Sequence, residues 1–109
     1  MNINHLEKWN WPPDVGKNIW GPIGWKWAHS LAQNYPENPS LDESYFTYLR
    51  LWYFITNLPC VECRRHAANY IFNNPPELIN RNTFKIWMWR FHNNVNKRLG
   101  KPKFRFENL

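Results

Sequence analysis

The stretch that decides the fold class is residues 82–102, NTFKIWMWRFHNNVNKRLGKP. Large apolar residues recur in it every three or four positions, which is the spacing of one face of a helix. We expect a helix that begins at Asn82 or Thr83 and is terminated by Gly100 followed by Pro102. The stripe predicted to face the core consists of Phe84, Met88, Phe91, Val95 and Leu99.

Earlier segments of the chain carry the same helical pattern, and no strand-like alternation accompanies them. The sequence therefore predicts an all-α fold, a four-helix bundle in which residues 103–109 add at most a short fifth helical turn. Pro22 suits the first turn of the first helix. The three earlier helices are expected over about residues 22–34, from a cap at Ser40 or Asp42 to about Asn57, and from Cys60 to about Phe72.

Length and composition indicate one small domain, because 109 residues are close to the lower limit for an independent core. Residues 1–20 show no clear period and are expected to form an irregular N-terminal arm, with residues 21–109 as the single helical-bundle domain. The start has no apolar segment typical of a signal peptide, and no apolar run approaches membrane-spanning length. We expect a soluble, cytoplasmic protein without stable membrane insertion.

The net charge of +6 admits acidic partners such as nucleic acid, a membrane surface or a phosphate-bearing cofactor. Aromatic residues make up 18% of the chain and include eight tryptophans. Flat aromatic rings pack in a core and also make good walls for a planar ligand. Composition therefore leaves room for a cofactor.

Cys60 and Cys63 are the two cysteines, separated by Val61 and Glu62 at the predicted start of a helix. On a helix this spacing places both sulfur atoms on one face, where they can form a disulfide, and a helix N-terminus favours a thiolate. Cys60 is nearer the terminus and is expected to be the more exposed nucleophile. Cys63 lies one turn further in, so the pair is predicted to be a redox site.

Other interpretations of the pair remain open from spacing alone. A zinc site could use Cys60, Cys63, His66 and His92, and a zinc-stabilised binding module could apply its basic C-terminal stretch to nucleic acid. A thioredoxin-like site shares the Cys-x-x-Cys spacing but needs a βαβ framework. Two buried thiols without a chemical role are the remaining alternative.

A second cluster follows the apolar stripe. On a helix, His92 and Asn96 share a face one turn apart and Asn93 flanks them, so hydrogen-bonding groups converge. The cations Lys97, Arg98 and Lys101 follow within two turns and suit a pyrophosphate, although a basic helix end also complements the helix dipole. In the first helix, Trp25 and His29 place an aromatic plane and an imidazole on one face.

Taken in order, these motifs resemble the Erv/ALR family of FAD-linked sulfhydryl oxidases. They are Gly21-x-x-x-Trp25-x-x-x-His29, Tyr35-Pro36, Cys60-x-x-Cys63 and His92-Asn93-x-Val95-Asn96-x-x-Leu99-Gly100-Lys101-Pro102. The stretch Cys63-Arg64-Arg65-His66-Ala67 is similar to the small versions encoded by large DNA viruses. For a viral chain, the host cytoplasm or the virion is the expected location.

The resemblance implies a role for each matching residue. Cys63 would lie beside the flavin ring and Cys60 would exchange with substrate thiols. FAD would be the cofactor, with Gly21 close to it. Trp25 and His29 would line the flavin and adenine region. The remaining cofactor-binding set would be His92, Asn93, Val95 and Asn96 around the nucleotide, and Lys97, Arg98 and Lys101 at its phosphates.

The resemblance further implies that the protein oxidises dithiol protein substrates, with a thioredoxin-like relay as a candidate partner. Oxygen would accept the electrons and give hydrogen peroxide. The matching family fold is usually dimeric, and aromatic residues of the second helix (Tyr45, Tyr48, Trp52 and Tyr53) are expected to cover one another in a homodimer. No nucleic acid or metal is implied.

This chain departs from the family pattern at several positions. Pro22 and Gly24 stand where many members have Arg and Thr or Ser, so the first cofactor contact is expected to use backbone. Many relatives also carry an extra disulfide that braces the last helix, and a second, mobile cysteine pair that shuttles electrons. Phe91 and Arg105 stand in the neighbourhood of the bracing cysteines, so aromatic packing and dimerisation are expected to compensate.

Overall fold

The computed structural model of the chain describes residues 16–106. Four helices follow one another in this part: α2 (Lys17–Gln33), α3 (Leu41–Thr56), α4 (Val61–Asn73) and α5 (Arg81–Leu99). Residues 16–106 contain no strand, so the predicted all-α fold class is confirmed. Within these residues, none of the helices combines the length and the apolar character needed to cross a membrane.

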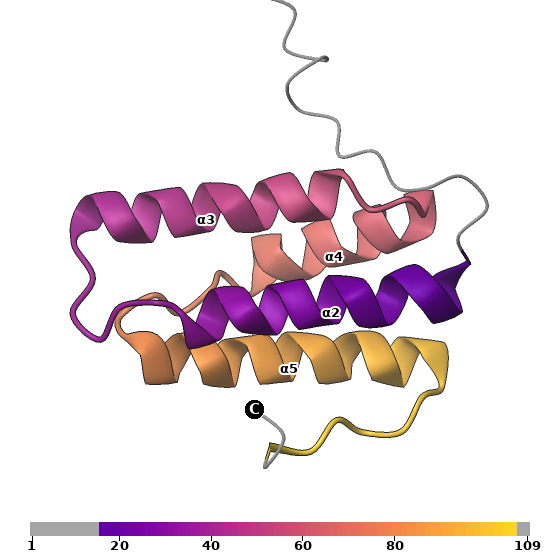
Figure 1. Ribbon diagram of the computed structural model, residues 1–109. Coiled ribbons are helices and arrows are strands. Elements are labelled where there is room, and N and C mark those ends of the chain that lie inside the picture. Colours follow the sequence, from indigo (N-terminus) through magenta and orange to yellow (C-terminus); the bar gives the residue numbers. More distant parts are fainter. Residues whose placement is uncertain (1–15, 107–109) are drawn as a thin grey trace, which may run out of the picture.

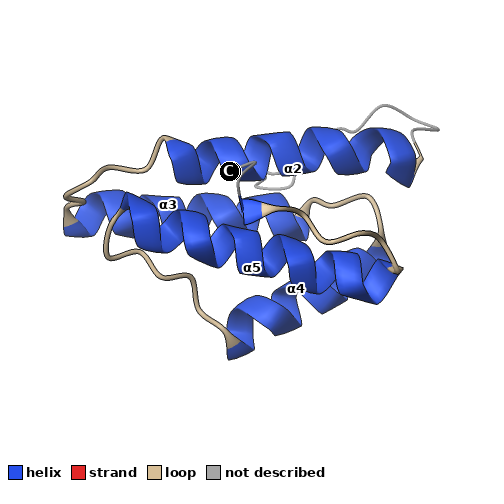
Figure 2. Cartoon of the chain, turned by 90° about the horizontal axis from the view of Figure 1, so that it is seen from below, coloured by secondary structure: helices blue, strands red, loops and turns tan. Residues whose placement is uncertain are grey.

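The helices form two packed pairs. α2 lies beside α5, and α3 lies beside α4 (Figure 1). Seen from below, α5 runs along α2 and the shorter α4 crosses at one end (Figure 2). On α2, the small residues Ala28 and Ala32 are almost completely buried. Their short side chains let the neighbouring helices approach α2 closely. The large side chains that fill the centre are Tyr35, Leu51, Ile55, Ile71, Phe84 and Met88.

Local sequence signals set the helix ends. Ser40 caps α3 in a capping box, in which its Oγ accepts from the Glu43 amide at 3.1 Å and Glu43 Oε1 accepts from the Ser40 amide at 2.9 Å. Gly100 ends α5 with a φ of 69°, the left-handed conformation that glycine adopts without strain. The predicted cap of α3 at Ser40 and the predicted C-terminal end of α5 at Gly100 are therefore confirmed.

The start of α2 differs from the prediction. The helix begins at Lys17 after an N-cap at Gly16, so residues 17–20 are helical and do not belong to an irregular arm. Pro22 lies inside the helix and not in its first turn. Burial explains why the helix persists across a residue without an amide hydrogen, since Trp20 is packed in the core two residues earlier.

The start of α5 also precedes the predicted one, because Asn80 is the N-cap and not Asn82 or Thr83. Asn80 Oδ1 accepts from the Thr83 amide at 2.9 Å and Thr83 Oγ1 accepts from the Asn80 amide at 3.1 Å. Of the expected fifth turn, residues 103–105 are not helical, Phe106 has a 3₁₀ conformation, and residues 107–109 lie outside the described residues. The expected arm over residues 1–15 also lies outside them.

Candidate active site

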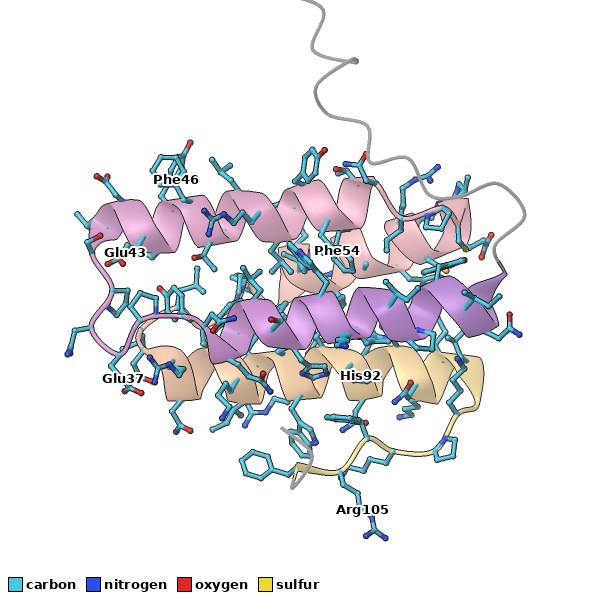
Figure 3. The ribbon with its side chains drawn as sticks, viewed as in Figure 1. Glu37, Glu43, Phe46, Phe54, His92 and Arg105 are labelled. Carbon is cyan, nitrogen blue, oxygen red and sulfur yellow. The ribbon has the colours of Figure 1, made fainter. Side chains whose placement is uncertain are left out.

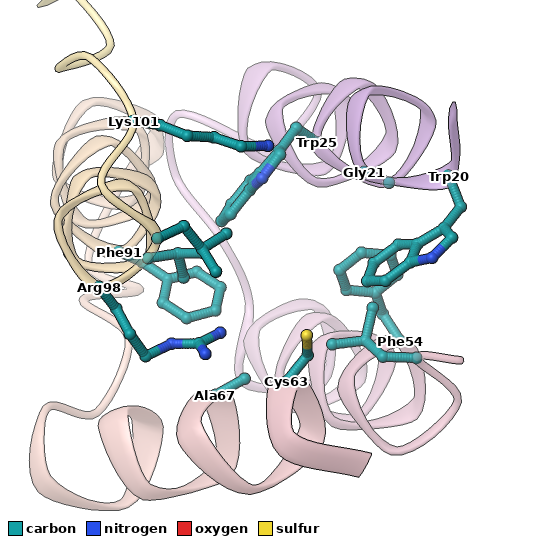
Figure 4. A pocket seen from close by; sticks show the side chains of 13 residues that line it. Trp20, Gly21, Trp25, Phe54, Cys63, Ala67, Phe91, Arg98 and Lys101 are labelled. Atoms are coloured by element: carbon teal, nitrogen blue, oxygen red, sulfur yellow. The ribbon is translucent and has the colours of Figure 1, made fainter. Parts of the chain in front are cut away.

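A cleft opens between α2, the C-terminal end of α3, α4 and the C-terminal half of α5, and its volume is about 600 Å³ with the open mouth included. Cys63 directs its sulfur atom into this space from α4 (Figure 4). Aromatic and aliphatic side chains form most of the wall, and two cations stand among them. The lining consists of Trp20, Gly21, Gly24, Trp25, Phe54, Leu58, Cys63, Ala67, Phe91, Val95, Arg98, Leu99 and Lys101.

The two cysteines occupy the first turn of α4. Cys60 is the N-cap residue, and its Sγ accepts a hydrogen bond from the Cys63 amide at 3.2 Å. Cys60 is half-buried, whereas Cys63 is only 8% exposed. An amide donor and the positive end of the helix dipole both favour negative charge on the Cys60 sulfur. The predicted arrangement, with Cys60 outside and Cys63 inside, agrees with these positions.

Arg64 fixes the turn that leads into the pair. Its guanidinium donates to the Leu58 carbonyl oxygen at 2.5 Å, across the Pro59 kink. Leu58 is itself buried in the cleft wall, so this contact joins the entry of α4 to the cleft. Arg64 therefore holds the backbone that precedes Cys60.

Beside the cleft, two histidines join α2 and α5. His29 Nε2 and His92 Nδ1 lie 2.8 Å apart, so one ring donates and the other accepts. The His92 ring stacks on Trp25 with centroids 3.8 Å apart and planes inclined by 12°. Trp25 also lines the cleft, so it connects the histidine pair to the space in front of Cys63.

The histidine pair is neutral at ordinary pH. Burial and the neighbouring His29 and Lys101 lower the pKa of His92 to about 4. Burial likewise lowers the pKa of His29. A hydrogen bond between two imidazoles requires that at least one of them lacks its second proton, and two charges here would repel one another.

The remaining predicted residues of α5, together with Lys101 just after it, fall into three groups. Val95, Arg98 and Lys101 line the cleft, with Arg98 reaching toward α4 and Lys101 toward Trp25 (Figure 4). Asn96 is 7% exposed and lies outside the cleft lining, so a contact between its amide and a nucleotide stays a prediction. Lys97 is exposed and lies outside the lining.

Asn93 is engaged elsewhere. Its Oδ1 accepts from the Phe104 amide at 2.7 Å and its Nδ2 donates to the Phe104 carbonyl oxygen at 3.1 Å. Both ends of the amide therefore hold the segment after α5. A direct contact between Asn93 and a nucleotide stays a prediction.

The cleft fits a flat ring that carries an anionic tail. A Cβ added at Gly21 would meet no heavy atom within 4 Å, so the backbone there borders open space. Trp25 and Phe91 offer aromatic surface, while Arg98 and Lys101 offer positive charge. Walls of this kind are complementary to an isoalloxazine ring joined to a pyrophosphate.

Residues 23–109 match the Erv1 / Alr family. The chain belongs to the Erv1/Alr family. A FAD-linked sulfhydryl oxidase of African swine fever virus (isolate Tick/Malawi/Lil 20-1/1983) is 43% identical over 82 residues, which are 75% of this chain and 69% of that protein.

The Erv1/Alr assignment extends to cellular relatives and to solved structures. The mitochondrial FAD-linked sulfhydryl oxidase ERV1 of Saccharomyces cerevisiae is 37% identical over 93 residues, and the match covers 85% of this chain but 48% of that protein. The crystal structure of the FAD binding domain of yeast Erv1 superimposes with a TM-score of 0.78 at 34% identity, covering 86% of this chain and 88% of that domain.

The zinc alternative has no support in this Erv1/Alr chain. Within residues 16–106 no three His, Cys, Asp or Glu side chains come together as a metal site. The proposed ligands separate because His92 is bound to His29, and His66 faces solvent with its Nε2 3.9 Å from Glu62. The four candidate ligands therefore do not come together at one metal site.

Sequence reasoning missed part of the Erv1/Alr cleft. Three lining residues were not proposed from the sequence: Trp20, Leu58 and Ala67. They meet at the cleft only because separate segments of the chain pack together, and the apolar pattern within one helix does not reveal that packing. The sequence indicated Phe54 only weakly as a cleft residue, because Phe54 is one of many apolar residues in the second predicted helix. Phe104 stacks on both histidines, at 4.9 Å from His29 and 4.6 Å from His92, and lies in a loop without periodicity.

The lowered pKa of His92 predicts an acid-sensitive fold. The unfolded chain takes up a proton below about pH 6.5, whereas folded His92 resists it until about pH 4, so stability is fully present above pH 6.5 and is lost as pH falls. The whole shift corresponds to about 3 kcal/mol. Thermal unfolding between pH 7 and pH 4 should show this loss in the native protein and much less of it in His92→Gln.

The control for that experiment is His66→Gln, which changes an exposed histidine on α4. It should keep the pH dependence of the native protein. Equal slopes for all three proteins would show that His92 titrates normally in the folded state.

Proposed function

We propose that this member of the Erv1/Alr family is a FAD-linked sulfhydryl oxidase that uses Cys60 and Cys63 as its redox pair. The observation that carries the proposal is the position of Cys63 on the wall of the cleft, with Cys60 capping α4 three residues earlier and its sulfur accepting from the Cys63 amide. Viral and cellular relatives are named FAD-linked sulfhydryl oxidases. The substrate is accordingly a protein dithiol.

Cys60 is the residue that meets the substrate. In the oxidised pair, a substrate thiolate attacks the Cys60 sulfur, the Cys60–Cys63 bond breaks, and Cys63 leaves as a thiolate. The second substrate thiolate then attacks the substrate sulfur of this mixed disulfide and releases Cys60. The substrate has lost two electrons and two protons, and the cysteine pair is reduced.

The inner position of Cys63 suits the next transfer. Bound FAD supplies two-electron chemistry, accepting the pair of electrons from the dithiol and passing them to oxygen with formation of hydrogen peroxide. Cys63 presents its sulfur to the apolar cleft, where few competing thiols can reach it. The Cys63 amide, which donates to the Cys60 sulfur, stabilises the thiolate that forms at this outer position.

The residues of α2 and α5 would hold the cofactor. Gly21 and Trp25 border the cleft, while His29 and His92 supply neutral imidazoles next to Trp25. Asn96 offers a side-chain amide. The cationic ends of Arg98 and Lys101 face the cleft. These positions support the binding set proposed from the sequence, with Asn93 and Lys97 as its peripheral members.

Purified protein should be yellow and should retain FAD without a covalent bond. His92→Ala should lower the flavin-to-protein ratio at least about tenfold, because it removes a stacked ring and leaves His29 without its hydrogen bond. The absorbance ratio of flavin to protein after gel filtration measures this. His66→Ala is the matched control, and colourless native protein would contradict the proposal.

The two cysteines should differ in reaction with an added disulfide. After reduction, Cys63→Ser should attack oxidised glutathione through Cys60 and keep one glutathione, since no second sulfur resolves the mixed disulfide. Cys60→Ser should react at least about tenfold more slowly, because Cys63 is 8% exposed. Intact-mass spectrometry over time follows the adduct.

The same variants give two further readouts. Both should lose oxidase activity toward dithiols. Only Cys60→Ser, which leaves a thiolate at Cys63 within the cleft, should show a broad long-wavelength absorption band when flavin is bound. Faster glutathionylation of Cys63 than of Cys60, or the band in Cys63→Ser alone, would reverse the two roles.

The outer face of α3 supports a homodimer. Tyr45, Phe46, Tyr48 and Tyr53 are exposed, with Tyr45 at 61%, and Phe46 points away from the bundle (Figure 3). Trp52, included in the predicted set, is half-buried, so its contribution is smaller. A second copy can cover the same apolar face by two-fold pairing.

Phe46→Glu should therefore weaken dimerisation by roughly 30-fold or more, because it places a charge in the proposed interface. Light scattering across a dilution series should report about twice the 13.4 kDa of one chain for the native protein. The control Phe72→Glu changes a residue on α4 that is 81% exposed and should leave the mass unchanged. A native protein that is monomeric throughout would contradict the dimer.

A further inference from the structure

Residues 101–106 turn back along α5 instead of leaving the bundle (Figures 1 and 2). The reversal begins at Gly100, whose left-handed backbone lets the Lys101 amide donate to the Asn96 carbonyl oxygen at 2.8 Å. The segment then passes Asn93 and reaches Trp89, almost three turns back along the helix. It thus crosses the side of α5 that carries His92.

Trp89 is the anchor of this returning segment. Its Nε1 donates to the Phe104 carbonyl oxygen at 2.9 Å. The Phe106 ring meets the Trp89 ring edge-on, with centroids 5.5 Å apart. The Lys103 ammonium lies 5.1 Å from the centre of the same indole. One side chain therefore holds three residues of the segment, by a hydrogen bond, an aromatic contact and a cation–π contact.

Phe104 is held from two sides. Trp89 and Asn93 both donate to its carbonyl oxygen, and Asn93 also accepts from its amide. The backbone polar groups of Phe104 are thereby satisfied by side chains of α5. A backbone fixed in this way gives the ring one direction, and the ring stacks on His29 and His92.

We propose that Trp89 is a positioning residue, which clasps residues 103–106 to α5 so that Phe104 covers the His29–His92 pair beside the cleft. The clasp is non-covalent, because the chain's two cysteines are both in the redox pair. Its consequence for cofactor retention rests on the proposed function. Its effect on the histidines does not, since the stacks exist in the protein alone.

The clasp keeps the histidine pair away from water and fixes its orientation. Without Trp89, the Phe104 carbonyl oxygen loses one of two donors and Phe106 loses its aromatic partner. The Phe104 ring then leaves the histidines more often, and water reaches them. The charged form of His92, which also faces Lys101, becomes less unfavourable.

The test compares Trp89→Leu, Trp89→Phe and Phe106→Leu in the protein as purified. NMR titration of the histidine rings should show the pKa of His92 rising by at least about one unit in Trp89→Leu. Trp89→Phe keeps the ring contacts but removes the donor, so it should fall between Trp89→Leu and the native protein. Flavin fluorescence on heating should show cofactor release in the same order, with the earliest release from Trp89→Leu.

Phe72→Leu is the matched control for Phe106→Leu, because it makes the same change at an exposed position on α4. It should titrate and release flavin as the native protein does. A His92 pKa in Trp89→Leu and Phe106→Leu equal to that of the control would overturn the clasp. Native protein without flavin would instead contradict the proposed function, and the titration would still decide the role of Trp89.

Discussion

The hydrogen bond between His29 and His92 is the contact on which the site depends, because it joins α2 and α5 across 63 positions of sequence. Each helix contributes one half of the proposed cofactor site, so their spacing sets the shape of the cleft. The bond needs at least one neutral ring, and burial favours neutral rings by lowering both pKa values. Trp25 and Phe104 supply that burial by stacking on the imidazoles. Aromatic packing therefore controls electrostatics at this site.

The redox pair depends on a different constraint, the start of a helix. Pro59 and the Arg64–Leu58 hydrogen bond set the turn, and Cys60 then caps α4 with its own sulfur. A serine or asparagine would cap a helix better, but only sulfur combines capping with disulfide exchange. One turn of helix then gives the two sulfurs different surroundings, solvent for Cys60 and the cleft for Cys63. The chemical division of the pair follows from helix geometry.

Much of this could be predicted from the sequence, since the apolar period of residues 84–99 and the cap at Ser40 act within one segment. The candidate site residues of α2 and α5 could be proposed because their motifs are local as well. The start of α2 could not be read correctly, because Pro22 looks like a first-turn residue and only tertiary burial of Trp20 reveals the additional turn. Phe104 was missed for a related reason, since its position depends on Trp89 and Asn93 and not on any period. Aromatic packing was expected in the neighbourhood of Phe91 and Arg105, and it is present there: Phe91 packs on Trp25, Tyr70 and Trp87, and Trp89 meets Phe106.

Charge illustrates why location matters more than composition. The basic residues at the end of α5 complement the negative end of the helix dipole, which was a sufficient explanation from the sequence. Their positions separate two roles, because Arg98 and Lys101 line the cleft while Lys97 faces solvent. Lys101 also follows Gly100 into the segment that carries Phe104, and its charge helps to keep His92 neutral. The same reversal of the chain thus has three effects. It places the Lys101 cation at the cleft for the proposed anionic ligand, it holds the Phe104 ring over the histidine pair, and it disfavours a proton on His92. The segment that follows α5 therefore couples the charge of the proposed cofactor site, its packing and the protonation of the histidines.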